Sequence, residues 1–380
     1  MTLMGPAVIG LITTITLMFA LRPLAVSSGF IDSPGERKSH IGDVPVIGGI
    51  AMFVGMAAGF AMVPEVARLH LFMLLAAGIL LGIGVLDDRY RVSVYVRLGA
   101  QAVAVSVMVF GGHLVITDIG DPLGIGTLQL GAAATIFTAL VAIAVINAFN
   151  FIDGIDGLAG CLAAIAIGAV GIVAADLTTP ITTHAIIACS SIVGFLMFNF
   201  PVYLNRRLRS FMGDAGSTLL GLIVVWLTIS VSQGETRPIS PVIGLWIVLV
   251  PLADLFTCFV RRIAKGKSPF RPGREHLHYI LLRGGLSVPQ VLGLLIVLGG
   301  FYAAMGLIGR SLAIPDVVMF GAWVVLMVSQ YPLMMKIALW SRCAHWKRLR
   351  EHRSVPGPAR LLAAPPNMQR HQIDQAADAR

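Results

Sequence analysis

Long apolar runs separated by short polar segments dominate the chain. Several of these runs reach the roughly 18–20 residues that a helix needs to cross the core of a bilayer. We expect about eleven transmembrane helices, at residues 3–24, 46–64, 69–87, 96–115, 129–148, 158–175, 182–200, 216–232, 239–260, 289–309 and 316–337. The pattern therefore predicts an all-α, polytopic integral membrane protein, with its membrane-embedded domain in residues 1–340.

Composition supports this class. The chain of 380 residues is 57% hydrophobic and 12% charged, whereas soluble domains carry about 25% charged residues. The first apolar run has no basic residue before Arg22, and a signal peptide carries its positive charge ahead of the apolar stretch. We therefore interpret residues 3–24 as an uncleaved first span.

Basic residues fall mainly in alternate loops between the expected spans. One side holds Arg37, Lys38, Arg89, Arg91, Arg206, Arg207, Arg209, the block from Arg261 to Arg283, and the residues from Arg342 onward. The other side holds Arg68, Arg237 and Arg310. Cytoplasmic loops carry the excess of Lys and Arg, so we expect the N-terminus outside and the C-terminus in the cytoplasm. This placement explains the net charge of +9 by topology, and we expect no nucleic acid partner.

The last residues differ from the rest of the chain. Residues 341–380 are expected to form a basic cytoplasmic tail, and five of its cations suit the anionic headgroups of membrane lipids: Arg342, Lys347, Arg348, Arg350 and Arg353. Beyond Ser354 the chain is rich in Pro, Ala and Gln, a composition typical of disorder.

Acidic and amide side chains gather at the cytoplasmic ends of the expected spans. They are Asp87 and Asp88 after the third span, Asn147, Asn150, Asp153 and Asp156 between the fifth and sixth, Asp214 before the eighth, and Asp254 within the ninth. The charge count that oriented the chain used none of these residues, so their common side is independent support for one site.

The chemistry of these groups favours a divalent cation. Asp87 and Asp88 adjoin a helix C-terminus, which disfavours anions by about 0.3–1 kcal/mol each. Asp153 and Asp156 would share a face of one helical turn, and Asp214 is placed like a helix N-cap. Oxygen ligands of this kind suit Mg²⁺, with Mn²⁺ as an alternative. The structural alternatives are turn residues, a simple cap and a solvated span end.

A basic loop follows the ninth span. It ends in Arg274, His276 and His278, and an extended segment would present both histidines on one face. Together with Arg274 they could clamp a diphosphate. Zinc ligation is the alternative, which no nearby Cys or third His in the sequence supports. Carboxylates for a metal and cations for phosphate together predict phosphoryl transfer.

These segments resemble the polyprenyl-phosphate N-acetylhexosamine-1-phosphate transferases, a superfamily that includes the phospho-MurNAc-pentapeptide translocase. The matching segments, which span about residues 32–283, are 84–88, 147–159, 211–217, 251–254 and 268–278. Residues 37–40 and 44–49 are similar to the branch that makes undecaprenyl-diphosphate-GlcNAc, although Val46 replaces the usual arginine and Tyr279 the usual last histidine. The resemblance implies transfer of GlcNAc-1-phosphate from UDP-GlcNAc to undecaprenyl phosphate at the cytoplasmic face of the bacterial inner membrane. That reaction starts a cell-surface polysaccharide.

Residue roles follow from the same resemblance. It implies that Asn150 and Asp214 contact Mg²⁺, and that Asp87, with Asp88 beside it, accepts or orients the lipid phosphate. Asp153 and Asp156 would hold the nucleotide-sugar. The expected substrate-binding residues are Arg97, Gln101, Asn147, Arg274, His276 and His278. Asp254 is either part of the site or structural, paired with Arg261. The family's usual homodimer is a further expectation.

Alternatives stay open at this point. The same chemistry could act on another UDP-N-acetylhexosamine or on UDP-MurNAc-pentapeptide. A secondary transporter would place its carboxylates near the bilayer midplane and often shows inverted repeats. A CDP-alcohol phosphotransferase would carry Arg where this chain has Gly160. A non-catalytic membrane scaffold would tolerate loss of Asp214.

Overall fold

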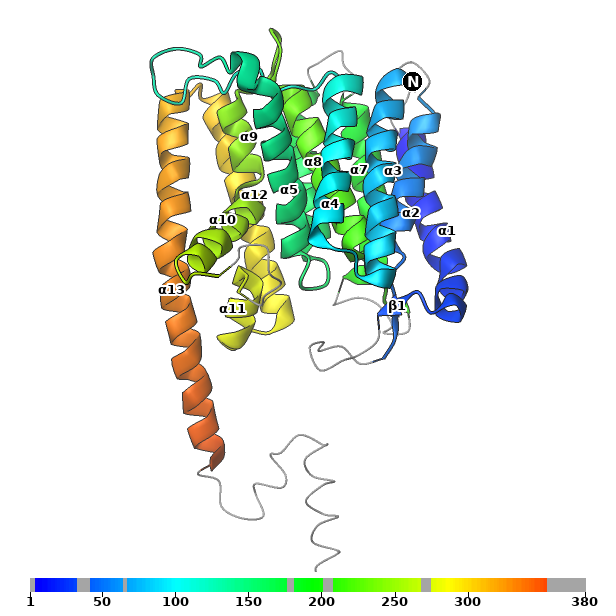
Figure 1. Ribbon diagram of the computed structural model, residues 1–380, viewed down its shortest axis with the longest axis vertical. Coiled ribbons are helices and arrows are strands. Elements are labelled where there is room, and N and C mark those ends of the chain that lie inside the picture. The colour runs from blue at the N-terminus through cyan, green and yellow to red at the C-terminus, as the bar shows by residue number, and fades with distance from the viewer. Residues whose placement is uncertain are drawn as a thin grey trace, which may run out of the picture.

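A bundle of apolar helices forms the molecule in the computed structural model, which describes residues 4–32, 42–63, 67–175, 181–200, 208–267 and 275–353 (Figure 1). The helices of the first half are α1 (Met4–Ser28), α2 (Gly48–Ala61), α3 (Ala67–Tyr90), α4 (Val94–Ser106) with its π-helical continuation η2 (Val107–Gly111), the 3-10 turn η3 (Gly131–Ala133), and α5 (Ala134–Ile152). Those of the second half are α6 (Leu158–Ala174), α7 (Ile181–Asn199), α8 (Gly213–Ser232), α9 (Pro241–Ile247), α10 (Leu249–Ile263), α11 (Leu277–Arg283), α12 (Val288–Ser311) and α13 (Asp316–Arg353).

The predicted all-α, multi-pass architecture is confirmed in its main feature. In the described residues, 8 helices are long and apolar enough to cross a membrane, and the bent pair α9–α10 brings the number to as many as 9. Two further apolar helices, α2 and α6, are shorter than a full span. A helix therefore lies in each apolar run of the sequence, while the count of about eleven spans stays a prediction.

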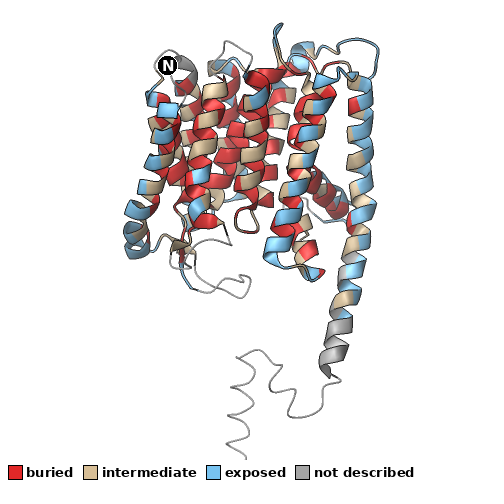
Figure 2. Cartoon of the chain, turned by 180° about the vertical axis from the view of Figure 1, so that it is seen from behind, coloured by how far each residue is buried: buried red, intermediate tan, exposed pale blue. Residues whose placement is uncertain are grey.

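The core of the bundle is centred on α8, which is buried along almost its whole length (Figures 1 and 2). Helices α3, α5 and α6 pack against α8, and α1, α2 and α7 pack together beside it. Close approach of α3 and α8 depends on Gly84, because a Cβ atom there would overlap the backbone of Ala215. This contact brings the end of α3 to the beginning of α8.

The predicted span 239–260 is not one straight helix. It forms α9 and α10, whose axes differ by 81°. Pro251 explains the break, since proline has no N–H to donate and its ring clashes with the carbonyl four residues earlier. As a result α10 lies obliquely at the lower end of the bundle in Figure 1, where it carries Asp254.

Segments that connect the helices make contacts at both ends of the bundle. At the lower end in Figure 1, β1 (Ile31–Asp32) pairs antiparallel with β2 (Val44–Pro45), and the backbone N–H of Phe211 donates to the Pro45 carbonyl at 2.9 Å. At the opposite end, Arg237 pairs with Asp118 at 2.6 Å. Which of the two ends faces the cytoplasm stays a prediction from the basic loops.

Helix α13 lies at the edge of the bundle and extends below it (Figure 1). It continues to Arg353, beyond the expected span end at residue 337. The N-terminal part of the expected tail, residues 341–353, is therefore helical, and residues 354–380 lie outside the described part of the chain.

Candidate active site

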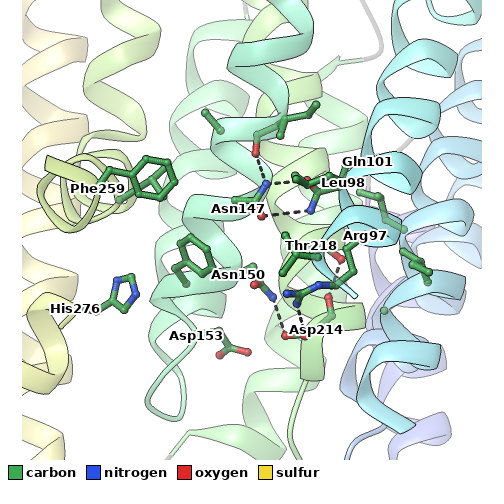
Figure 3. Close-up of a pocket in the computed structure, with 18 of the residues that line it drawn as sticks. Arg97, Leu98, Gln101, Asn147, Asn150, Asp153, Asp214, Thr218, Phe259 and His276 are labelled. Atoms are coloured by element: carbon green, nitrogen blue, oxygen red, sulfur yellow. Dashed lines mark hydrogen bonds and ion pairs between the residues drawn. The ribbon is translucent and has the colours of Figure 1, made fainter. Parts of the chain in front are cut away.

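A cavity of about 530 Å³ opens at the lower end of the bundle, between α3, α4, α5, α8, α10 and α11 (Figure 3). One part of its wall is apolar, formed by side chains of α3, α4 and α5: Leu80, Ile83, Val94, Leu98, Leu140, Ile143 and Ala144. The other part is polar, and its members are Arg97, Gln101, Asn147, Asn150, Asp153, Asp214, Thr218, Arg262, His276 and Tyr279. Most of the polar candidates from the sequence thus meet in one cavity.

Arg97 connects two of the predicted carboxylates. Its Nη1 atom lies 2.8 Å from Asp87 Oδ2 and 3.3 Å from Asp214 Oδ2. The other Asp87 oxygen accepts the backbone N–H of Val92 at 2.6 Å. Both ion pairs use one nitrogen. Within the described ranges Nε and Nη2 have no partner, so these donors are available for an anion in the cavity.

Asn150 on α5 orients Asp214 from the other side. Its Nδ2 atom donates to Asp214 Oδ1 at 2.8 Å and to Ser217 Oγ at 3.0 Å. The amide therefore presents its NH₂ group to α8, and its Oδ1 atom is the group that a cation could bind. Figure 3 shows Asn150, Asp214 and Arg97 side by side in the cavity.

Gln101 and Asn147 form a second pair deeper in the cavity. Asn147 Nδ2 donates to Gln101 Oε1 at 2.7 Å, and Gln101 Nε2 lies 3.4 Å from Asn147 Oδ1. This reciprocal amide pair satisfies polar groups between α4 and α5.

Asp153 follows the C-terminal end of α5 and lines the cavity. Burial raises the pKa of its carboxyl well above the ordinary value, and nearby carboxylates raise this pKa further. Those neighbours are Asp214, Asp156 and Asp88. Among the described residues Asp153 has no hydrogen-bond or ion-pair partner, so a cation would be stabilised beside it.

Asp88 has a different position from Asp87. Its carboxylate accepts the backbone N–H groups of Asp214 at 2.8 Å and of Ala215 at 3.3 Å. Asp214 itself is not the N-cap that the sequence suggested, because α8 begins at Gly213 with Met212 as its cap residue. Asp88 therefore supplies the cap from another helix, and it lies outside the cavity lining.

Asp156 does not line the cavity either. Its Oδ2 atom pairs with Arg209 Nε at 2.6 Å and with Nη2 at 2.5 Å. The expected helical turn that would align Asp156 with Asp153 is absent, since both residues lie in the irregular segment between α5 and α6. Asp156 thus anchors the 153–157 loop to the segment before α8.

The two histidines occupy unequal positions. His276 lines the cavity as the cap residue of α11, whereas His278 lies within that helix and is fully buried behind the wall. The expected extended segment is absent, although the two rings stack with an interplanar angle of 7°. His278 packs against Gly154, and burial lowers its pKa to about 4, so this ring is neutral near pH 7.

Sequence reasoning missed the contact of Asp254. We considered Arg261 as its structural partner, but Asp254 Oδ2 lies 2.8 Å from His276 Nδ1 instead. Arg262 and Tyr279 also line the cavity without having been singled out as binding residues. The predicted Arg274 lies outside the described residues.

Comparison with known proteins identifies the class of this multi-pass membrane protein. Residues 70–232 match glycosyl transferase family 4. Among curated proteins, the chain is 38% identical to the undecaprenyl-phosphate alpha-N-acetylglucosaminyl 1-phosphate transferase of Pasteurella multocida, over 82% of this chain and 87% of the relative. The enzymes of the same name from Haemophilus influenzae and Escherichia coli K12 are 36% and 38% identical, over 81% of this chain and 87% and 84% of the relatives. The chain belongs to the family of undecaprenyl-phosphate alpha-N-acetylglucosaminyl 1-phosphate transferases, as the sequence motifs indicated.

Proposed function

We propose that this protein transfers GlcNAc-1-phosphate from UDP-GlcNAc to undecaprenyl phosphate, with release of UMP and formation of undecaprenyl-diphosphate-GlcNAc. The observation that carries the proposal is the two-part cavity, which offers an apolar wall next to a group of carboxylates, amides and cations. Membership in the transferase family supports the same reaction. The product would start a cell-surface polysaccharide.

The apolar part of the cavity suits the polyprenyl chain. Leu80, Leu98 and Leu140 belong to three different helices and line the same space. A lipid tail in this groove would bring its phosphate to Arg97, whose free guanidinium nitrogens can donate to phosphate oxygens. Asp87 lies outside the cavity lining and holds Arg97 in place at 2.8 Å, and its role as the acceptor of the lipid phosphate proton stays a prediction.

The opposite wall suits the nucleotide-sugar. His276, Arg262 and Tyr279 come from α10 and the α11 segment and line the cavity. Figure 3 shows His276 across the cavity from Arg97. Cationic and ring N–H donors of this kind stabilise the charge of a diphosphate. An acceptor phosphate and a donor diphosphate would then meet next to Asp153 and Asp214.

The reaction follows from this arrangement. An oxygen of undecaprenyl phosphate attacks the β-phosphorus of UDP-GlcNAc, a new P–O bond forms, and the bond from the β-phosphorus to the bridging oxygen breaks. The bridging oxygen and its electron pair leave with UMP. Arg97 and the His276 wall neutralise the charge that develops on the phosphoryl oxygens.

The donor set fits a hard divalent cation. Asp214, the Oδ1 atom of Asn150 and Asp153 offer oxygen ligands, which Mg²⁺ prefers, with Mn²⁺ as the alternative. Mg²⁺ sites commonly use one or two carboxylates together with waters and substrate phosphates. Such an ion would supply charge neutralisation at the diphosphate, and the position of Asp153 and Asp214 in the lining of one cavity supports its binding there.

Topology completes the proposal. Placing the cavity in the cytoplasm agrees with the positive-inside rule, since Arg89, Arg91 and Arg209 lie at its end of the bundle, whereas Arg237 and Arg310 lie at the other. UDP-GlcNAc is made in the cytosol, so a cavity on the cytoplasmic side would be open to this substrate. The proposal also includes about eleven spans, a location in the bacterial inner membrane and a homodimer.

The test is UMP release by purified protein in detergent, with UDP-GlcNAc, undecaprenyl phosphate and Mg²⁺. We expect release that requires the lipid phosphate and stops with EDTA, with a lipid product whose mass equals undecaprenyl-diphosphate-GlcNAc. UDP-GalNAc and UDP-MurNAc-pentapeptide serve as comparison donors. UMP release from only one of these two donors would show that the enzyme uses a different sugar. If folded protein released UMP from none of the donors, the proposed transferase activity would be wrong.

A further inference from the structure

His276 makes its closest polar contact with a buried carboxylate outside the cavity. Its Nδ1 atom lies 2.8 Å from Asp254 Oδ2, and the second oxygen, Oδ1, accepts the backbone N–H of Leu277 at 2.7 Å. Asp254 is 2% exposed and His276 5%. The carboxylate therefore makes two polar contacts in a site that excludes water, and one of them is with the imidazole ring.

This contact determines which nitrogen of the ring faces the cavity. An ionised carboxylate only accepts hydrogen bonds, so Nδ1 carries a hydrogen and Nε2 remains for the cavity that His276 lines. The ring is also packed against Phe151, at a centroid distance of 5.4 Å, and stacked on His278. Carboxylate contacts of this kind fix the tautomer and the orientation of functional histidines.

Cys258 raises the alternative of a metal centre. Ligand atoms of Asp254, Cys258 and His276 all lie within 4.8 Å of one another. The shortest contact in this group is that of Asp254 with His276 at 2.8 Å, whereas Cys258 Sγ lies 3.4 Å from both His276 Nδ1 and the Glu275 carbonyl. We therefore interpret the carboxylate and the imidazole as a hydrogen-bonded pair, and metal analysis tests the alternative.

We propose that Asp254 is a positioning residue, which holds His276 so that Nε2 contacts a phosphate oxygen of the UDP-sugar. The inference rests on the proposed function and adds a residue to its machinery. In the complex, the phosphate would stabilise a proton on Nε2 and the Asp254 carboxylate a proton on Nδ1, so the ring would be held in its protonated form. Asp254 itself does not touch the substrate.

A double-mutant cycle on kcat/KM for UDP-GlcNAc tests this pairing. We expect His276→Gln to lower kcat/KM by about 100-fold or more and Asp254→Asn by about 10- to 100-fold. The conservative Asn keeps the size of the side chain but presents an NH₂ group to Nδ1. Because Asp254 acts through His276, the double variant should be no slower than His276→Gln alone. A further loss of the same size in the His276→Gln background would overturn the proposal.

A second measurement needs no turnover. Diethyl pyrocarbonate acylates an unprotonated ring nitrogen, and peptide mass spectrometry quantifies the reaction at His276 alone. We expect reaction at His276 in the wild type, protection by UDP-GlcNAc, and a reaction several-fold slower in Asp254→Asn, where the tautomer with hydrogen on Nε2 is favoured. Equal reaction rates in the two proteins would contradict the pairing even if UMP release failed and the proposed function with it.

Metal analysis separates the remaining alternative. Wild-type protein and Cys258→Ser should contain no stoichiometric zinc after purification without chelators, and Cys258→Ser should keep its kcat/KM within about 3-fold, as a substitution that removes neither partner of the pair. If the wild type contained stoichiometric metal and Cys258→Ser did not, the three residues would form a metal centre and the proposal of a positioning pair would be wrong.

Discussion

The carboxylate of Asp88 on α3 accepts the backbone N–H of Asp214 on α8 at 2.8 Å. Its second oxygen accepts the N–H of Ala215 at 3.3 Å. The cap residue of α8, Met212, has no side-chain hydrogen bond of its own to these groups. The two adjacent aspartates thus have separate tasks, since Asp87 pairs with Arg97 and Asp88 holds the helix that carries Asp214.

Replacing Asp88 tests its task as a cap. In Asp88→Asn one of the two N–H groups would face an NH₂ group and lose its acceptor. Loss of a helix cap costs about 1 kcal/mol, and displacement of Asp214 can lower the rate by up to about 100-fold. We expect a lower unfolding midpoint in detergent together with slower UMP release. Full thermal stability with a large loss of rate would indicate instead that Asp88 contacts the substrate.

Arg97 is expected to bind the lipid phosphate. Arg97→Gln removes the charge that bridges Asp87 and Asp214, and we predict a fall in kcat of about 100-fold or more. Arg97→Lys keeps the charge as a compact ammonium that cannot reproduce the planar fork, and its rate should lie between those of the wild type and the Gln variant. The measurement is UMP release at several concentrations of undecaprenyl phosphate. Wild-type kinetics in Arg97→Gln would remove Arg97 from the site.

Close packing of Gly154 against His278 predicts a compensating pair. A Cβ atom at Gly154 would overlap the His278 ring, so Gly154→Ala should displace the 153–157 loop from α11 and reduce both stability and rate. In the double variant Gly154→Ala, His278→Ala the overlap is gone. We expect it to be more stable than Gly154→Ala alone, measured by thermal unfolding. Additive losses in the double variant would show that the two positions do not interact.

The buried, neutral His278 also predicts a pH dependence of stability. Burial lowers its pKa from 6.5 to about 4, so the unfolded chain binds more protons than the native protein between these values. Stability contributed by this residue should therefore fall as the pH drops from 6.5 toward 4. We predict that His278→Gln loses less stability than the wild type over this range, measured by unfolding in detergent. Parallel curves for the two proteins would contradict a neutral His278.

The sequence was a good guide to the elements that depend on local composition. Apolar runs predicted the helices because the length of a span and its hydropathy are local properties. The break between α9 and α10 is caused by a single residue, Pro251. It was not predicted because Pro251 lies within a continuous apolar run. The extension of α13 to Arg353 could not be read from hydropathy either, since Arg and Lys are good helix formers outside the membrane.

Site residues were predicted less evenly. Asn150, Asp214, Arg97 and His276 line one cavity, while their roles in binding and transfer stay predictions. Asp156 pairs with Arg209, and Asp88 binds the backbone at the start of α8. Neither contact can be predicted from the spacing of residues along the chain. Contacts between distant segments, such as Asp254 with His276, depend on how helices pack and need the structure.

The central claim is that the cavity around Asp214 is the site of transfer. The most direct test compares lipid-dependent UMP release from UDP-GlcNAc by Asp214→Asn and by the matched control Asp121→Asn, whose carboxylate lies in the loop at the opposite end of the bundle and accepts Gly126 N–H at 3.0 Å. We predict that Asp214→Asn lowers kcat by about 100- to 1,000-fold, while Asp121→Asn stays within about 3-fold of the wild type. Equal rates for Asp214→Asn and the control, with both proteins folded, would contradict the assignment of this cavity.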